Sequence, residues 1–307
     1  MSRRLALILC IAVGAMLLGA CTNSGTKALE SMKFGFNPEE VREYSLSFFY
    51  ERTFPEKEKL IEFWMQMDVR TLEKDENGNT RLKFTFQPQK LYCLFEEVIH
   101  EYDMSAPPDV YSEEARSFMA FAGLTVETVV SSNGIIISSD WRNLNLPEFL
   151  MPHTAQITQF VLSNYLNDSY LFGLYYPTGY DSVRVGALWS DPSKPATHYP
   201  MPEQWQLLQQ KDGKAIIWLE NHEFDFGSYY LITQNLDTTG TSAYDFKTSG
   251  QVTVSLEDGW PISVVMAQIT DAKIGTDKST AEGQIKVSAS SATRLELISV
   301  NGKPYKK

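Results

Sequence analysis

The residue types that most often bind metal ions are scattered along this sequence. The four histidines are His100, His153, His198 and His222. None of them has a second ligand at the spacing that zinc sites use, and His100-Glu101 and His222-Glu223 both lack the second histidine of a zincin helix. We therefore interpret the histidines as structural or surface residues and expect no metal site.

One acidic loop imitates a calcium site. Asp75, Asn77 and Asn79 match the start of an EF-hand loop, but Phe86 stands where that loop needs a bidentate glutamate. An Asn-Gly pair inside "DENGN" is typical of a tight hairpin turn, because it tolerates positive φ. We expect a turn here.

Catalytic motifs are also missing from the sequence after residue 25. It has no G-x-S-x-G elbow, Walker loop or dinucleotide fingerprint. Ser24 and Lys27 match an S-x-x-K pattern, but they lie in a small polar segment that cannot hold a nucleophile and a base in fixed geometry. We expect no catalytic residue and no cofactor, and a hydrolase with an unrecognised site is a remote alternative.

The N-terminus has the pattern of an export signal. Arg3 and Arg4 precede an uncharged run from Leu5 to Ala20, which matches the charged and apolar regions of a signal peptide. The run is shorter than the roughly 20 apolar residues that cross a bilayer.

The next residues, Leu18-Gly19-Ala20-Cys21, resemble the lipobox of bacterial lipoproteins. The resemblance implies removal of residues 1–20, a diacylated Cys21 thiol and attachment to the membrane through this lipid. Thr22, a residue other than aspartate, implies passage to the outer membrane, facing the periplasm. An ordinary signal peptide with an incidental cysteine and a short membrane helix are the alternatives.

The charge of the chain excludes one class of partner. The sequence has 27 basic and 38 acidic residues, and residues 1–20 hold two of the basic ones and no acidic one, so the remainder carries a net charge of −13. Such a surface argues against nucleic acid and against a basic patch that docks on anionic lipid.

The cysteines allow no internal disulfide in the mature chain. Cys10 leaves with the signal peptide and Cys21 carries the lipid, so that Cys93 remains alone. We interpret Cys93 as a small buried hydrophobic residue.

Alternation of apolar and polar residues with a period of two is the main structural signal. It runs through residues 61–70, 81–86 and 251–257, and it predicts antiparallel strands with one covered face. Turns are predicted where Asn-Gly or Asp-Gly pairs separate these runs, at residues 75–79, 131–134, 210–214 and 257–260.

Three segments have helical spacing. They are residues 112–122, which end before Gly123, residues 152–166, and the more ambiguous residues 90–102. The predicted fold is therefore mainly β (α+β), a strongly curved antiparallel sheet or half-barrel with one to three helices against its concave face. Residues 1–20 are the predicted signal peptide, 21–38 a lipidated flexible tether and 39–307 one β-rich domain, whose parts 39–145 and 183–300 suggest an internal duplication.

Three blocks resemble a family of bacterial lipoproteins of unknown function that is built on curved antiparallel sheet. They are "SFMAFAGLTVETVVSSNGIIISSDWRNL", "LYYPTGYDSVRVGALWS" and "GQVTVSLEDGWPISVVMAQIT". The shape that this family implies is distantly similar to the periplasmic half-barrels that carry lipoproteins and lipids. The family has no assigned functional residues.

One apolar face could contact a ligand. The candidate ligand-facing residues are Phe63, Met65, Met67, Phe84 and Phe86, and thioethers adapt well to irregular apolar guests. The same residues would equally form the core beneath a helix. The sequence thus leaves two main hypotheses, a lipid-anchored protein that binds a lipid or a lipoprotein acyl chain, and a structural or interaction lipoprotein of the cell envelope whose protein partner is unknown.

Overall fold

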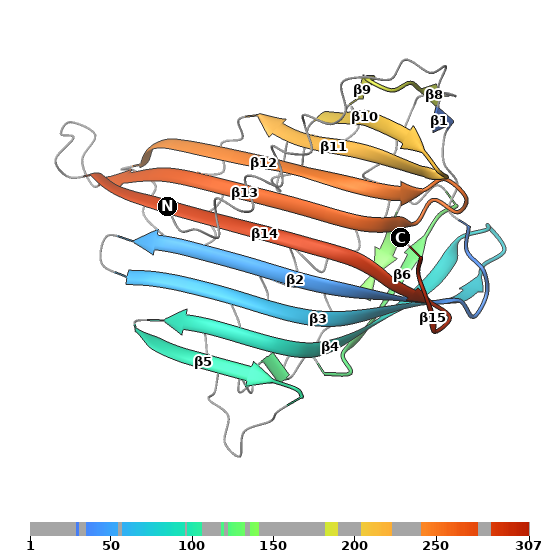
Figure 1. Ribbon diagram of the computed structural model, residues 1–307, viewed down its shortest axis with the longest axis horizontal. Helices are drawn as coiled ribbons and strands as arrows, with labels where there is room; N and C mark the ends of the chain where they lie inside the picture. The colour runs from blue at the N-terminus through green and yellow to red at the C-terminus, as the bar shows by residue number, and fades with distance from the viewer. Residues whose placement is uncertain are drawn as a thin grey trace.

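The computed structural model contains one large antiparallel sheet of thirteen strands (Figure 1). The residues that the structure describes are 29–30, 35–54, 57–95, 97–105, 118–119, 122–132, 136–140, 182–189, 204–222, 241–275 and 284–306. The strands of this sheet are β2 (Val41–Phe54), β3 (Lys57–Lys74), β4 (Thr80–Phe95), β5 (Val98–Asp103), β6 (Thr125–Val130), β7 (Ile136–Ser139), β9 (Leu188–Trp189), β10 (Gln204–Lys211), β11 (Lys214–His222), β12 (Thr241–Ser255), β13 (Pro261–Gly275), β14 (Gln284–Val300) and β15 (Lys303–Pro304). A separate pair consists of β1 (Leu29–Glu30) and β8 (Ser182–Val183).

The order of the strands brings the two ends of the domain together. Across the sheet the order is β7-β6-β4-β3-β2-β14-β13-β12-β11-β10-β9, with β5 paired to β4 and β15 paired to β14. The first and last long strands, β2 and β14, are therefore neighbours at the centre of the sheet. Strands β2 to β7 lie on one side of this junction and β9 to β13 on the other. The internal duplication of residues 39–145 and 183–300 stays a prediction.

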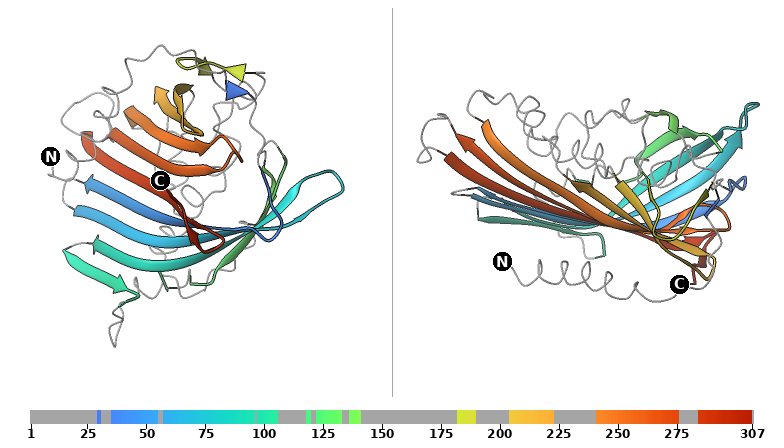
Figure 2. Two further views of the ribbon diagram at one scale, coloured as in Figure 1. Left: turned by 45° about the vertical axis from the view of Figure 1, so that its right-hand side comes forward. Right: turned by 90° about the horizontal axis from the view of Figure 1, so that it is seen from above.

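The sheet is curved and open, as the sequence predicted (Figures 1 and 2). Its longest strands have 14 to 18 residues, against a usual length of about five or six, so each covered face is long. Helix is rare in the described part of the chain, where α-helix is limited to residues 118–119. Those two residues belong to the predicted helix 112–122, and the predicted helix 152–166 lies outside the described residues.

Three of the four predicted turns lie where the sequence placed them, and the fourth, at residues 131–134, lies partly outside the described residues. Gly78, Gly213 and Gly259 have φ of 81°, 73° and 77° and connect β3 to β4, β10 to β11 and β12 to β13. In the first turn the Asp75 carboxylate accepts hydrogen bonds from the backbone of Asn77 and Asn79 at 2.9 and 2.8 Å. The EF-hand-like residues thus form a hairpin turn, as predicted.

The helix predicted at residues 90–102 is wrong. This segment forms the end of β4 and most of β5, which pair with Leu91 opposite Tyr102 and Cys93 opposite His100. A helical stripe would have buried Val98 and Ile99, which are 54% and 56% exposed. Pairing of β4 with β3 supplies the backbone hydrogen bonds, so tertiary context decided between two patterns that the local sequence allowed.

The predicted signal peptide, Cys21 and most of the predicted tether lie outside the described residues. Residues 35–37, at the end of that predicted tether, lie against the sheet, and the Phe36 side chain is 5% exposed. Among the described residues, no helix is both long enough and apolar enough to cross a membrane.

Candidate functional site

The five candidate ligand-facing residues lie together on the buried face of β3 and β4. Their exposed fractions are 2% for Phe63, 1% for Met65, 3% for Met67 and 0% for Phe84 and Phe86. Met67 pairs directly with Phe86 across the two strands. Sequence alternation therefore identified a continuous apolar surface, which we call the inner face of the sheet.

Strict alternation holds each of these side chains on the inner face. The intervening residues of β3, such as Glu62, Gln66 and Asp68, are only half-buried, because successive residues of a strand point to opposite faces. In β4 a bulge shifts the register, so that Trp64 pairs with Lys90 but Met65 pairs with Pro88. The extra residue changes the inward parity of β4 from even to odd positions.

Aromatic rings pack closely on the inner face near β3. The Phe48 ring lies 5.0 Å from that of Phe63, and the Phe118 ring lies 5.8 Å from Phe63 and 5.7 Å from Tyr102. Phe118 comes from the predicted helix 112–122, so part of that segment covers Phe63. This contact is what a core beneath a helix requires.

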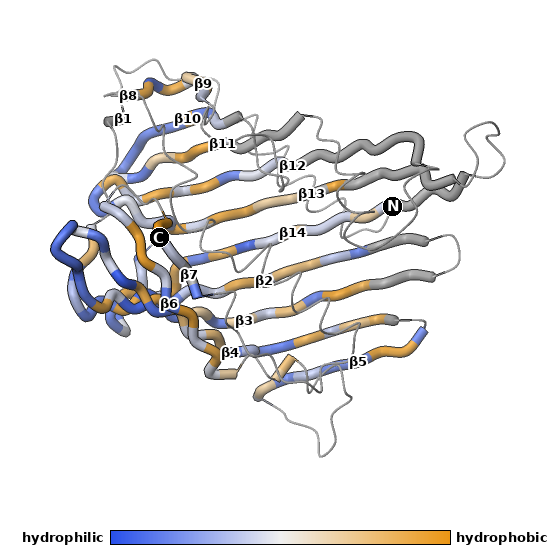
Figure 3. The backbone as a smooth tube through the Cα atoms, turned by 180° about the vertical axis from the view of Figure 1, so that it is seen from behind, coloured by the Kyte–Doolittle hydropathy of each residue, from blue (hydrophilic) through white to orange (hydrophobic). Residues whose placement is uncertain are grey.

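The apolar surface continues across the central junction into β11, β12 and β13. Its further members are Tyr44, Leu46, Leu295, Leu297, Val264, Met266, Val252, Val254, Ala215 and Ile217. Figure 3 shows the alternation as changes between orange and blue along the strands. The inner face is thus one surface from β4 to β11, built from both sides of the junction.

Two hydroxyl groups interrupt this apolar surface in the middle of β14. Leu295 and Leu297 point inward, but the next two inward positions are Thr293 and Ser291, with exposed fractions of 4% and 8%. The hydroxyl of Thr293 has no hydrogen-bond partner, although Phe48 and Met266 flank it in the neighbouring strands. A buried hydroxyl without a partner costs about 1–3 kcal/mol of folding free energy.

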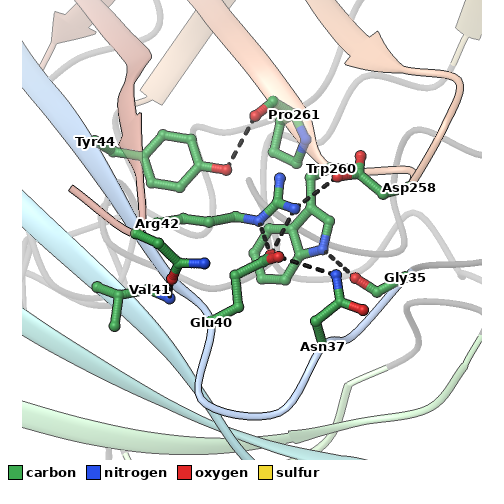
Figure 4. A network of polar contacts seen from close by, with 10 residues as sticks. Gly35, Asn37, Glu40, Val41, Arg42, Tyr44, Asp258, Trp260 and Pro261 are labelled. Carbon is green, nitrogen blue, oxygen red and sulfur yellow. Dashed lines mark hydrogen bonds and ion pairs between the residues drawn. The ribbon is translucent and has the colours of Figure 1, made fainter. Parts of the chain in front are cut away.

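A buried ionic cluster lies at the start of β2, next to the inward-facing Tyr44 (Figure 4). Arg42 donates to the Glu40 carboxylate at 2.7 Å and to the Asp258 carboxylate at 2.6 Å. Arg42 and Glu40 are 4% and 7% exposed, and the guanidinium carbon lies 4.5 Å from the centre of the Trp260 ring. The cluster thus joins the start of β2 to the turn between β12 and β13.

The same cluster binds the segment that precedes β2. The Trp260 indole N–H donates to the Gly35 carbonyl at 2.9 Å, and the Phe36 ring meets the Trp260 ring edge-on with the ring centres 5.6 Å apart. Glu40 also accepts a hydrogen bond from the Asn37 amide at 2.9 Å. Residues 35–40 are therefore held against the sheet by both polar and aromatic contacts.

The electrostatics of the cluster keep Arg42 charged and Tyr44 neutral. Burial alone would lower the pKa of Arg42, but the surrounding Tyr44, Asp258 and Glu40 outweigh it and raise this pKa. Burial raises the pKa of Tyr44, whose hydroxyl donates to the Pro261 carbonyl at 3.0 Å. With two carboxylates bound to one guanidinium, the cluster acts as a structural link between segments.

Sequence reasoning missed this cluster, although one signal for it was present. Glu40 and Arg42 precede Tyr44, Leu46 and Phe48 at the same parity, so two charged residues occupy buried positions just before and just inside the start of a strand. Charged residues are almost never buried unless they are paired. Such a position therefore indicates a buried partner, but it does not say which one.

Two further residues were singled out from the sequence. Cys93 is buried among the apolar residues of the inner face, as predicted, and Cys21 lies outside the described residues. Within the described ranges, no three histidine, cysteine or acidic side chains are placed to share a metal ion.

Comparisons with known proteins give no family. No protein-family model matches this sequence, and no curated protein matches it. Among solved structures, the chain is similar to lipovitellin, studied for its lipid-protein interactions, with 12% identity and a TM-score of 0.47 over 89% of this chain and 26% of that chain. It also matches Pseudomonas aeruginosa OccK5 (OpdH) with 7% identity and a TM-score of 0.18 over 86% of this chain and 100% of that one. Both TM-scores are too low for either likeness to bear on function.

Proposed function

We propose that this protein is a lipid-anchored, non-enzymatic component of the bacterial cell envelope that binds an apolar ligand on the inner face of its sheet. The ligand class is a lipid or the acyl chain of a lipoprotein. The observation that carries the proposal is the continuous apolar inner face of an open, curved sheet with long strands. Met65 and Met67 lie within it and can adjust to guests of irregular shape.

The proposed anchor is a diacylated Cys21, with the domain on the periplasmic side of the outer membrane. The resemblance of Leu18-Gly19-Ala20-Cys21 to a lipobox supports it. The intact mass of the membrane-extracted protein tests the anchor, because the chain should begin at Cys21 and carry diacylglycerol. A mature chain that begins elsewhere without lipid would exclude it.

A second candidate function is a structural or interaction lipoprotein without a small-molecule ligand. The almost complete burial of Phe63, Met65 and Phe84 favours it, as do the ring contacts from Phe118. In that case the inner face is a filled core, and its residues contribute to stability alone.

One set of variants distinguishes the two candidates. Met65→Gln and Met67→Gln place a polar group on the inner face, whereas Gln66→Ala changes the neighbouring residue on the opposite face. If the inner face binds a lipid, the methionine variants should weaken uptake of a fluorescent fatty acid severalfold at temperatures where they remain folded. Gln66→Ala should leave uptake unchanged.

The result for the wild-type protein decides between the candidates. A ligand-binding protein should carry lipid when it is purified folded from cells, as mass spectrometry detects, or should bind lipid in titration. If the wild type does neither, and the methionine variants lose only stability, by about 1–3 kcal/mol each as buried polar groups do, the structural function stands instead.

A further inference from the structure

The inner face contains a polar position whose surroundings give it no hydrogen bond. Thr293 is 4% exposed and its hydroxyl has no partner. Its two neighbouring strands are β2 and β13, and their directly opposite residues are Phe48 and Met266. The hydroxyl therefore lies between two apolar side chains.

The backbone offers this hydroxyl no substitute partner. β14 is paired on both sides, so its N–H and C=O groups are engaged in the two ladders. A threonine in such a place costs folding free energy that a valine of the same shape would not. Buried polar groups in native proteins almost always have a hydrogen-bond partner, so a hydroxyl that the fold leaves unsatisfied points to a partner from outside the chain.

The residues paired with Thr293 across the neighbouring strands favour a ligand that has both apolar parts and a polar group. This cross-strand row runs from Phe63 through Phe48 to Thr293, then to Met266 and Gly250. The row is thus apolar on both sides of Thr293. A guest that fills it needs long apolar parts and one polar group near the central junction.

We infer that the ligand of the inner face is an acyl lipid, and that a carboxyl or ester oxygen of this lipid accepts a hydrogen bond from the Thr293 hydroxyl. This inference rests on the proposed function, since it names the ligand class of the same surface. It assigns Thr293 as a specificity-determining residue that distinguishes acyl lipids from pure hydrocarbons.

Two probes separate apolar binding from recognition of the polar group. Diphenylhexatriene is a fluorescent hydrocarbon that reports apolar binding. Palmitic acid and methyl palmitate are the competitors, and each should displace it by binding to the same inner face. In the full-length chain, Thr293→Val should leave the affinity for diphenylhexatriene unchanged. It should weaken displacement by both acyl compounds roughly three- to ten-fold, as expected for the loss of one hydrogen bond.

Two further variants serve as controls. Thr293→Ser keeps the hydroxyl and should retain wild-type displacement. Thr80→Val removes another buried hydroxyl without a partner, which lies beside the turn between β3 and β4, and should change neither measurement.

The outcomes separate this inference from the proposed function. If Thr293→Val binds diphenylhexatriene and the acyl compounds displace it as well as they do from the wild type, the role of Thr293 is overturned and apolar binding still stands. An equal loss with Thr80→Val also overturns it, because the effect would then be a general one on the fold. If the wild-type chain binds neither diphenylhexatriene nor palmitic acid, the proposed function itself fails.

Discussion

The middle of the inner face is held together by apolar packing, whereas the ionic cluster at the start of β2 is held together by ion pairs and hydrogen bonds. Around Phe63 and Met65, apolar side chains alternate with polar ones along each strand and are held by burial alone. Around Arg42, two carboxylates, an indole ring and the segment before β2 converge on one guanidinium. The first region tolerates many apolar residues of similar volume, whereas the second requires particular partners.

The inner face can therefore adapt its contacts, whereas the ionic cluster needs a fixed geometry. A surface that must accept an apolar ligand gains from non-directional contacts. A link between β2 and the turn between β12 and β13 needs directional ones, because a buried charge without its partner is strongly destabilising. We therefore expect substitutions in the two regions to differ in size and in pH dependence.

Removal of the guanidinium should have the largest effect on stability. Arg42→Met leaves the Glu40 and Asp258 carboxylates in place without their partner and should lower the free energy of unfolding by about 3–5 kcal/mol. The matched control is Arg294→Met, which breaks an ion pair with Glu296 that is more than half exposed on the arginine side and should cost under about 1 kcal/mol. Urea denaturation measures both, and equal costs would mean that the cluster is no special link.

Added volume in the middle of the sheet should have a smaller effect. A Cβ atom on Gly250 would lie 2.6 Å from the Val265 carbonyl oxygen and 2.7 Å from the Met266 sulfur. The sulfur can move but the backbone oxygen cannot, so Gly250→Ala should cost about 1–3 kcal/mol. Ser249→Ala, on the neighbouring residue, is the control. If Gly250→Ala left the free energy of unfolding unchanged, the inner face would have space for the added methyl group.

Tyr44 lies between the two regions and should give the smallest change at neutral pH. Tyr44→Phe removes the hydrogen bond to Pro261 and should cost about 1 kcal/mol at pH 7. The stability advantage of the wild type over this variant shrinks in alkali. Because burial raises the pKa of Tyr44 in the folded state, its contribution to stability is present below the unfolded pKa of about 10 and is lost as pH rises above it.

The free energy of unfolding of Tyr44→Phe should therefore fall less steeply above pH 10 than that of the wild type. Denaturation series at pH 7, 10 and 11 measure the two slopes. Parallel slopes would mean that Tyr44 ionises as readily in the folded chain as in the unfolded one.

The alternation of apolar and polar residues was enough to predict strands of the inner face. It failed where a segment fitted both the period of a strand and the period of a helix. Phe63, Met65 and Met67 alternate with polar residues without ambiguity, and the structure places them as predicted. Residues 90–102 fit both a helix and a strand, and only the pairing of β4 with β3 and β5 decided for strands. The hairpin turns were predictable, because positive φ at Gly78 and Gly213 depends on residues adjacent in sequence.

The sequence by itself determined the strand pattern of residues 61–70, 81–86 and 251–257, the face that these strands bury and the turns at Gly78, Gly213 and Gly259, because these features depend on neighbours a few residues apart. Only the tertiary structure decided that β2 lies beside β14, that Arg42 meets Asp258 across 216 residues, and that Thr293 faces Phe48 and Met266 without a hydrogen bond. Partners so distant in sequence leave no periodic signal, since pairing between strands is set by the packing of the whole sheet and the burial it achieves.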